Sequence, residues 1–160
     1  MCLTRSKQSS RKYSSNNFGC IWYNCTMNNT SASDMPLCVA IIICNEIIED
    51  KTTNNKTLVG LFNSISVSAL PAMHPRLFFF ASVTHIQGDQ PLSFTITSPT
   101  GKEILRADGA VSSGGDIGAV IDLTLQVLGL TVGEEGMHSL NVVSGQTVLG
   151  SRSFSVLMQK

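Results

Sequence analysis

The chain has 160 residues, with 11 basic and 11 acidic side chains, so its formal net charge at pH 7 is zero. A chain of this length fits one domain with its own core, and a hydrophobic content of 42% excludes a wholly disordered protein. The balanced charge argues against nucleic acid as the main partner, because binding a phosphate backbone requires a surplus of Lys and Arg.

The first 34 residues differ in composition from the rest of the chain. Arg and Lys outnumber the one acidic residue, Asp34, and neither a strand period nor a helix period runs through this part. The apolar cluster at Phe18–Tyr23 is shorter than a signal peptide requires. We therefore expect residues 1–34 to be a disordered tail or a mis-annotated extension, with Met35 as the true first residue.

From residue 36 onward, strand patterns alternate with turn residues. Segments 36–44 and 77–85 are apolar on both faces, which is typical of interior strands. Segment 57–67 predicts one continuous strand, with Gly60 as a bulge or a point of close approach. Alternation of apolar and polar residues predicts half-buried strands at 91–98, 120–128, 137–143 and 151–157, and a hairpin partner is expected at 103–111.

The alternation also predicts which side chains point into the core. The inward set is Leu92, Phe94, Ile96, Ile121, Leu123, Leu125, Val127, His138, Leu140, Val142, Phe154 and Val156. A helix over residues 119–130 is disfavoured, because β-branched residues alternate there and glycines flank the segment. Turns are expected at Ser98–Gly101 and at Ser144-Gly145, and a loop with Pro71 and Pro75 is expected to end strand pairing.

These elements predict an all-β fold with about eight short strands and no long helix. Antiparallel strands in this number close into a sandwich or a barrel, and the strands with one polar face favour the sandwich. We expect residues 35–160 to form a single two-sheet antiparallel β-sandwich, either immunoglobulin-like or C2-like.

The cysteines indicate a reducing setting. Cys38 and Cys44 are six residues apart, so in one strand they point the same way but lie about 20 Å from each other, too far for a disulfide. Buried free thiols favour a cytoplasmic location. The apolar run 37–44 is much shorter than the roughly 20 residues of a membrane helix, so no membrane partner is expected.

Five segments within residues 36–157 form a recognisable set of motifs, namely Cys44-Asn45-Glu46, Leu58–Ile65, Pro71–Pro75, Pro99–Gly101 and Gly136–Val156. In these motifs the chain resembles a family of small prokaryotic proteins known only as a domain of unknown function. The chain departs from the pattern at His138, where Tyr is usual, and at Asn45, where Asp is common. The resemblance implies a β-sandwich and assigns no activity, so it supplies no functional residues.

Candidate chemistry is sparse. His74, His85 and His138 lack metal-ligand spacing, and His138 is expected to be a buried, hydrogen-bonded imidazole. A calcium site needs several converging oxygens, whereas the aspartates that a C2-like site would use are single residues in separate turns, namely Asp50, Asp89, Asp108 and Asp116. We assign no catalytic, cofactor-binding or metal-binding residue and expect no cofactor.

Three functions fit these patterns. The first is a non-enzymatic binding or accessory module that acts through protein–protein contacts, with an unknown protein partner or with a second copy at an edge strand. The second is a calcium- or lipid-binding C2-like domain. The third is a small enzyme whose site is assembled from Glu46, His74, Arg76 and Asp89, which requires these side chains to converge. We favour the first, which makes the protein a non-enzyme.

Overall fold

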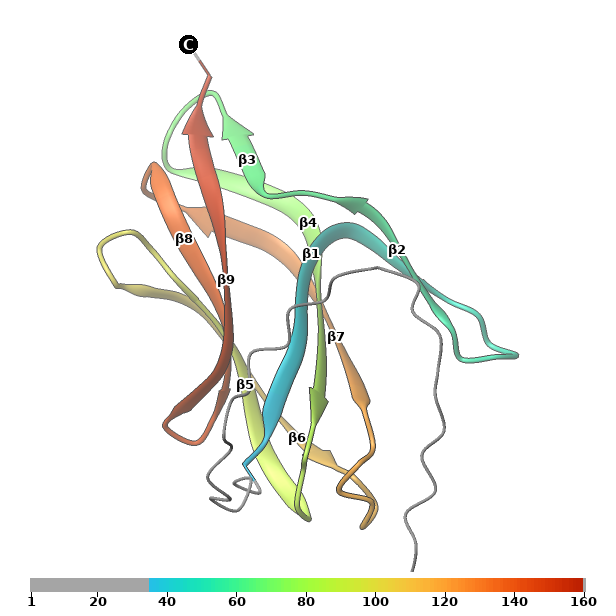
Figure 1. Ribbon diagram of the computed structural model, residues 1–160. Coiled ribbons are helices and arrows are strands. Elements are labelled where there is room, and N and C mark those ends of the chain that lie inside the picture. The colour runs from blue at the N-terminus through green and yellow to red at the C-terminus, as the bar shows by residue number, and fades with distance from the viewer. Residues whose placement is uncertain (1–34, 160) are drawn as a thin grey trace, which may run out of the picture. The chain divides into compact units, whose positions relative to one another are not determined.

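The computed structural model of the protein describes residues 35–159, and these residues form nine β-strands in two sheets (Figure 1). The expectations for residues 1–34 lie outside the described residues. The strands are β1 (Leu37–Glu49), β2 (Lys56–Leu61), β3 (Ser64–Val67), β4 (Ala72–Thr84), β5 (Asp89–Thr97), β6 (Glu103–Ser112), β7 (Ile121–Val132), β8 (Gly136–Ser144) and β9 (Thr147–Met158).

The two sheets confirm the predicted sandwich. One sheet has four strands in the order β2-β1-β4-β7, and the other has five in the order β3-β9-β8-β5-β6. The segments that are apolar on both faces became β1 and β4, which are the interior strands of the four-stranded sheet. All neighbouring strands are antiparallel except β3 and β9, which are parallel.

The strand order is immunoglobulin-like. In that fold, strands A, B and E lie in one sheet, and strands G, F and C lie in the other, where variable-type domains add C′. Strands β1, β4 and β7 take the places of A, B and E, and β9, β8, β5 and β6 take those of G, F, C and C′. Of the two subtypes expected from sequence, the structure therefore has the immunoglobulin-like one.

Apolar packing fills the space between the sheets. Phe79 of β4 stacks on Phe94 of β5 with ring centroids 6.3 Å apart, and Leu140 of β8 is fully buried beside this core. In antibody domains a disulfide joins strands B and F, which correspond to β4 and β8. Here the two described cysteines, Cys38 and Cys44, are both free. The residues predicted to point inward are buried or half-buried, so the alternation assigned the faces correctly.

One predicted strand proved to be two. Segment 57–67 divides at Phe62 and Asn63, so that β2 belongs to the four-stranded sheet and β3 to the five-stranded sheet. The backbone N–H of Phe62 still donates to Ile43 in β1, whereas the carbonyl of Asn63 already accepts from Ser155 in β9. The chain therefore changes sheets within two residues, and the strand count rises from about eight to nine.

Two further local predictions were wrong. Pro75 lies inside β4 instead of ending it, and it sits between the pairs His74–Leu130 and Arg76–Leu128, opposite Gly129. A strand tolerates proline where no ladder donor is required. Cys38 and Cys44 do not point the same way, because a bulge at Val39 shifts the register: Cys38 pairs with the inward Val83 and Cys44 with the outward Phe78.

Candidate interaction surfaces

The residues of the hypothetical enzyme site do not form one constellation. Glu46 and Arg76 are exposed, and Arg76 lies against the ring of Phe78, 5.9 Å from its centroid. His74 is half-buried with its ring 6.0 Å from that of Phe62. His74 lies near the start of β4, whereas Asp89 begins β5, which follows the other end of β4. About ten residues of β4, or roughly 33 Å along the strand, lie between His74 and that other end.

The sequence also allows a structural ion pair of Glu46 with Arg76 or Arg106, and no such pair is formed among residues 35–159. Arg106 instead contacts Glu103 and Asp108 on its own strand, at 3.5 and 2.9 Å. In the same part of the chain, no three His, Cys, Asp or Glu side chains come together as a metal site would require. Residues 35–159 also contain no helix of the length and hydrophobicity needed to cross a membrane.

His138 is a core residue, as the alternation predicted. Its side chain is fully buried, its ring stacks on Phe154 at 5.4 Å, and its Nδ1 lies 3.2 Å from the carbonyl oxygen of Gly136. A tyrosine commonly occupies the start of strand F in immunoglobulin-like domains, where it bonds to backbone just upstream. His138 at the start of β8 takes that position and makes a similar short-range bond.

The two described thiols are poorly suited to nucleophilic chemistry. Burial raises the pKa of the Cys38 thiol, and a hydrogen bond involving the backbone of Ala40 offsets this only in part. Burial likewise raises the pKa of Cys44, against a smaller opposite effect from the backbone of Glu46. A raised pKa lowers the thiolate fraction, and the thiolate is the reactive form.

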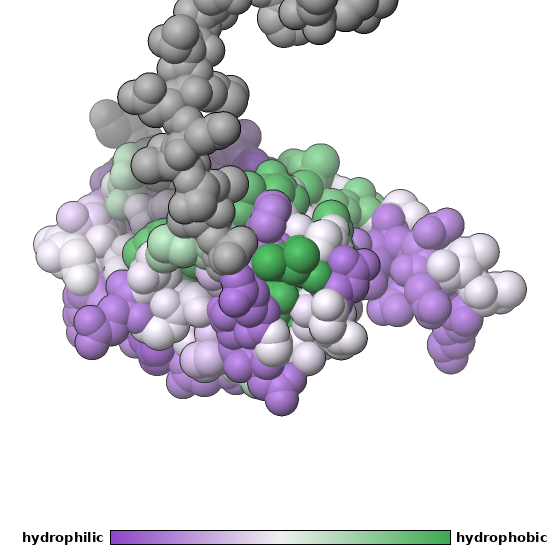
Figure 2. All heavy atoms as spheres, turned by 60° about the horizontal axis from the view of Figure 1, so that its bottom comes forward, coloured by the Kyte–Doolittle hydropathy of each residue, from purple (hydrophilic) through white to green (hydrophobic). Residues whose placement is uncertain are grey.

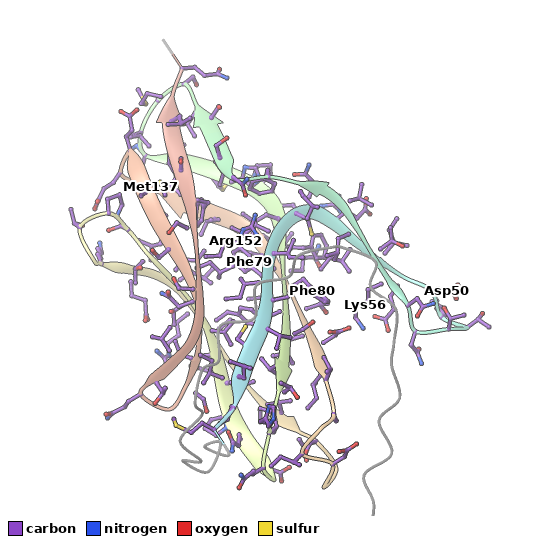
Figure 3. All side chains as sticks on the ribbon, in the orientation of Figure 1. Asp50, Lys56, Phe79, Phe80, Met137 and Arg152 are labelled. Carbon is purple, nitrogen blue, oxygen red and sulfur yellow. The ribbon has the colours of Figure 1, made fainter. Side chains whose placement is uncertain are left out.

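The outer face of the four-stranded sheet carries exposed apolar side chains where β1 and β2 form a hairpin. Cross-strand register places Leu61 next to Cys44 and Phe78, and Val59 next to Glu46, on the face that points away from the core. Leu61 is 60% exposed, Val59 40% and Ile48 52%. Figure 3 shows that this hairpin projects from the sandwich, with Asp50 and Lys56 at its tip.

A second apolar feature lies between the edge strands β6 and β7. A cleft of about 230 Å³ opens there and reaches the core residues Leu92 and Phe94. Its β6 wall is built from small residues, Ala107, Gly109 and Ala110, and its β7 wall from Leu123 and Leu125. The small side chains of β6 leave this side of the sandwich open.

The end of the sandwich that holds the β6–β7 loop is mixed in character. Figure 2 brings this end forward and shows patches of hydrophobic surface among polar ones. Ile117 and Val120 in this loop are 42% and 63% exposed. Exposed apolar residues therefore run along the loop up to the start of β7.

These surfaces were not found by sequence reasoning. The half-exposed leucines and valines look like core residues in a strand pattern, and only the strand order shows that they lie on an outer face or at an edge. One sequence feature could have indicated the outer surface. Segment 36–44 is apolar on both faces, so one of its apolar faces had to point away from the core.

Comparison with known protein families identifies the family of this chain. A family of unknown function, DUF6941, matches residues 39–157. The chain belongs to this family. The match runs from within β1 to within β9, in agreement with the resemblance seen in the sequence motifs.

Other comparisons add no functional relative. No functionally curated protein matches the sequence at a significant level. An immunoglobulin-like protein from Pseudomonas aeruginosa is similar in structure, with 14% identity, a TM-score of 0.41, and coverage of 78% of this chain and 98% of that one.

Parts of two enzymes are also similar in structure. One is β-glucosidase 3B from Thermotoga neapolitana, with 15% identity, a TM-score of 0.39, and coverage of 58% of this chain and 16% of that one. The other is the alkylpurine DNA glycosylase AlkC from Pseudomonas fluorescens, with 16% identity, a TM-score of 0.41, and coverage of 73% and 30%. None of these likenesses bears on the function of this chain.

Proposed function

We propose that this protein is a non-enzymatic binding module that acts through protein–protein contacts. The observation that supports the proposal is the exposed apolar face of the β1–β2 hairpin, formed by Ile48, Val59 and Leu61. Contiguous exposed apolar surface on a soluble domain marks an interaction site. The hairpin projects from the sandwich, so a partner reaches both of its strands without a change in the core.

The neighbouring residues suit an apolar protein partner. Next to Leu61 on the same face lie Cys44 and Phe78, and Phe78 is itself covered on one side by Arg76. Aromatic and Arg side chains are enriched in protein interfaces, and charged groups are depleted at their centres. Glu46 lies opposite Val59 within this surface, and Arg76 lies against Phe78, so both offer charge for polar contacts with the partner. The free thiols Cys38 and Cys44 support a reducing, cytoplasmic setting for this contact.

The test is quantitative capture from the native host with the full chain as bait. Leu61→Lys places a charge in the centre of the apolar face, and Val148→Lys places the same charge at a 56% exposed site on β9. We expect a protein held at near 1:1 stoichiometry by the wild type and by Val148→Lys, and lost from Leu61→Lys. The proposal is overturned when the wild type holds no stoichiometric partner, or when all three baits hold it equally.

A further inference from the structure

Strand β7 is the least protected edge of the sandwich. It pairs with β4 on one side, and no strand of residues 35–159 pairs with its other side. Natural edge strands are kept short or carry Lys, Pro or charged residues that discourage further pairing. β7 has 12 residues, no Lys, Arg or Pro, and one charged side chain, Asp122, whose carboxylate accepts a hydrogen bond from Ser82.

The other edges differ in this respect. β2 has six residues and begins with Lys56, and β3 has only four residues. β6 carries charged residues along its length, at Glu103, Arg106 and Asp108. The exposed backbone N–H and C=O groups of β7 are therefore the most open to pairing with an added strand.

The sequence around the centre of β7 is a chemical palindrome. Residues 120–128 read Val-Ile-Asp-Leu-Thr-Leu-Gln-Val-Leu, and positions equally distant from Thr124 match in character. The matched pairs are Leu123 with Leu125, Asp122 with Gln126, Ile121 with Val127, and Val120 with Leu128. An antiparallel pair of two such strands, related by a two-fold axis at Thr124, places the members of each pair opposite each other.

Each of these cross-strand pairs is favourable. Thr124 faces its own copy, and Thr–Thr pairs across antiparallel strands are stabilising. In such a pair the amide of Gln126 would donate to the carboxylate of Asp122 in the second copy, twice per dimer. Val120, just before β7, and Leu128 are 63% and 70% exposed and would cover each other across the pair.

The inward-facing side chains of the added strand can pack beside the β6–β7 cleft. Leu123 and Leu125 line the cleft of about 230 Å³ between β6 and β7 and are only half-buried. A strand added to β7 extends the four-stranded sheet and sets its own Leu123 and Leu125 beside this cleft. The cleft then lies under a continuous apolar layer instead of facing solvent.

We propose that a second copy of this chain occupies the β7 edge, in an antiparallel β7–β7 pair with its two-fold axis at Thr124. The result is an isologous dimer in which the same strand serves both copies. The palindrome favours a second copy over another protein. In an antiparallel self-pair, residues equally distant from Thr124 on either side lie opposite each other, so they must be compatible; pairing with another protein sets no such requirement. The inference is independent of the partner proposed for the β1–β2 hairpin, since the two surfaces lie on opposite edges of the four-stranded sheet.

Sedimentation equilibrium of the full chain tests the proposal through position 126. Gln126→Asp sets two carboxylates opposite each other twice per dimer, and we expect the dimer dissociation constant to rise about tenfold. Gln126→Lys creates two ion pairs with Asp122, and we expect tighter dimers whose stability falls with added salt. The double variant Asp122→Asn/Gln126→Asp exchanges the partners and is expected to restore wild-type dimerisation.

Ser153→Asp is the matched control, because it adds the same charge at an exposed site on β9 of the other sheet. Gln126 is exposed, so its variants keep the core, which circular dichroism checks. A chain that stays monomeric up to about 1 mM overturns the proposal. A dimer whose dissociation constant is the same in all variants also overturns it, because the interface then lies elsewhere.

Discussion

The guanidinium of Arg152 in β9 donates a hydrogen bond to the backbone carbonyl oxygen of Ile41 in β1, with Nη1 and O 3.1 Å apart. Its Nη2 donates to the side chain of Asn63, where the chain passes from one sheet to the other. Figure 3 shows Arg152 between β9 and β1. Arg152 therefore joins both sheets and the crossing segment on the side opposite the β6–β7 cleft.

Loss of this arginine is expected to destabilise the sandwich. Arg152→Met keeps much of the aliphatic volume and removes the two hydrogen bonds, so we expect the free energy of unfolding to fall by about 2 kcal/mol. Urea denaturation measures this change. The matched control is Arg106→Met, which removes exposed ion pairs and is expected to cost less than about 1 kcal/mol. Equal losses in both variants would refute a special role for Arg152.

Gly60 and Asn45 are expected to be energetically coupled. Gly60 has a φ of +66°, and a Cβ atom there would collide with the side-chain amide of Asn45. Gly88 has a similar φ of +64° but open space around it. We expect Gly60→Ala to cost about 1 kcal/mol more than Gly88→Ala.

The excess is expected to disappear in an Asn45→Ala background, because the collision is then removed. The test measures thermal unfolding of Gly60→Ala and Gly88→Ala, each in the wild-type and in the Asn45→Ala background. An excess that persists without the Asn45 amide would assign the cost to the backbone alone.

His138 is expected to act by filling space. In residues 35–159 its Nε2 is buried without a hydrogen-bond partner, whereas its ring stacks on Phe154. His138→Ala leaves a cavity and is expected to cost about 3 kcal/mol of unfolding free energy. His138→Phe keeps the stack and removes the unpartnered nitrogen, at the loss of the bond to Gly136, so we expect a change within about 1 kcal/mol. Chemical denaturation distinguishes the two; equal losses would mean that the bond to Gly136 dominates.

Asp108 is expected to make stability depend on pH. A hydrogen bond from the Ser93 hydroxyl, with a further contribution from Arg106, lowers the pKa of the Asp108 carboxyl below its usual value. A group with a lowered folded-state pKa stabilises the fold above its unfolded pKa of about 3.9. This contribution is lost as the pH falls through the folded-state pKa.

Ser93→Ala is therefore expected to raise the pKa of Asp108, which a carboxyl NMR titration measures. The difference in Tm between the wild type and Ser93→Ala should be larger at pH 6 than at pH 2. A difference in Tm that stays constant over this range would show that the hydroxyl acts independently of the carboxylate charge.

Period-two alternation predicted the inward faces of the half-buried strands, because burial of one face is a local property of each strand. His138, Leu140 and Val142 illustrate this, since all three are fully buried as expected. Strand order depends on pairings between distant segments, so the sequence did not reveal that β2 and β3 lie in different sheets. The bulge at Val39 is likewise a feature of pairing, and it reversed the predicted orientation of Cys38.

The candidate surfaces were invisible from sequence for a related reason. Segment 36–44 was expected to be an interior strand and 57–61 part of one continuous strand, and nothing local shows that Val59 and Leu61 face outward. The palindrome at residues 120–128 is present in the sequence, but it gains meaning only because β7 is an edge strand. Arg152 was missed because its partners, Ile41 and Asn63, come from segments far away in the chain.

The parallel pairing of β3 with β9 sets an order of events during synthesis. β3 leaves the ribosome early, yet its partner, Ser155–Met158, emerges only after strands β4 to β8 have been made. Until then Ile65 has no neighbouring strand and is open to misfolding or to capture by a chaperone. Premature termination before Thr147 would therefore remove β9 and also leave β3 without a paired strand, whereas β8 would keep its pairing with β5.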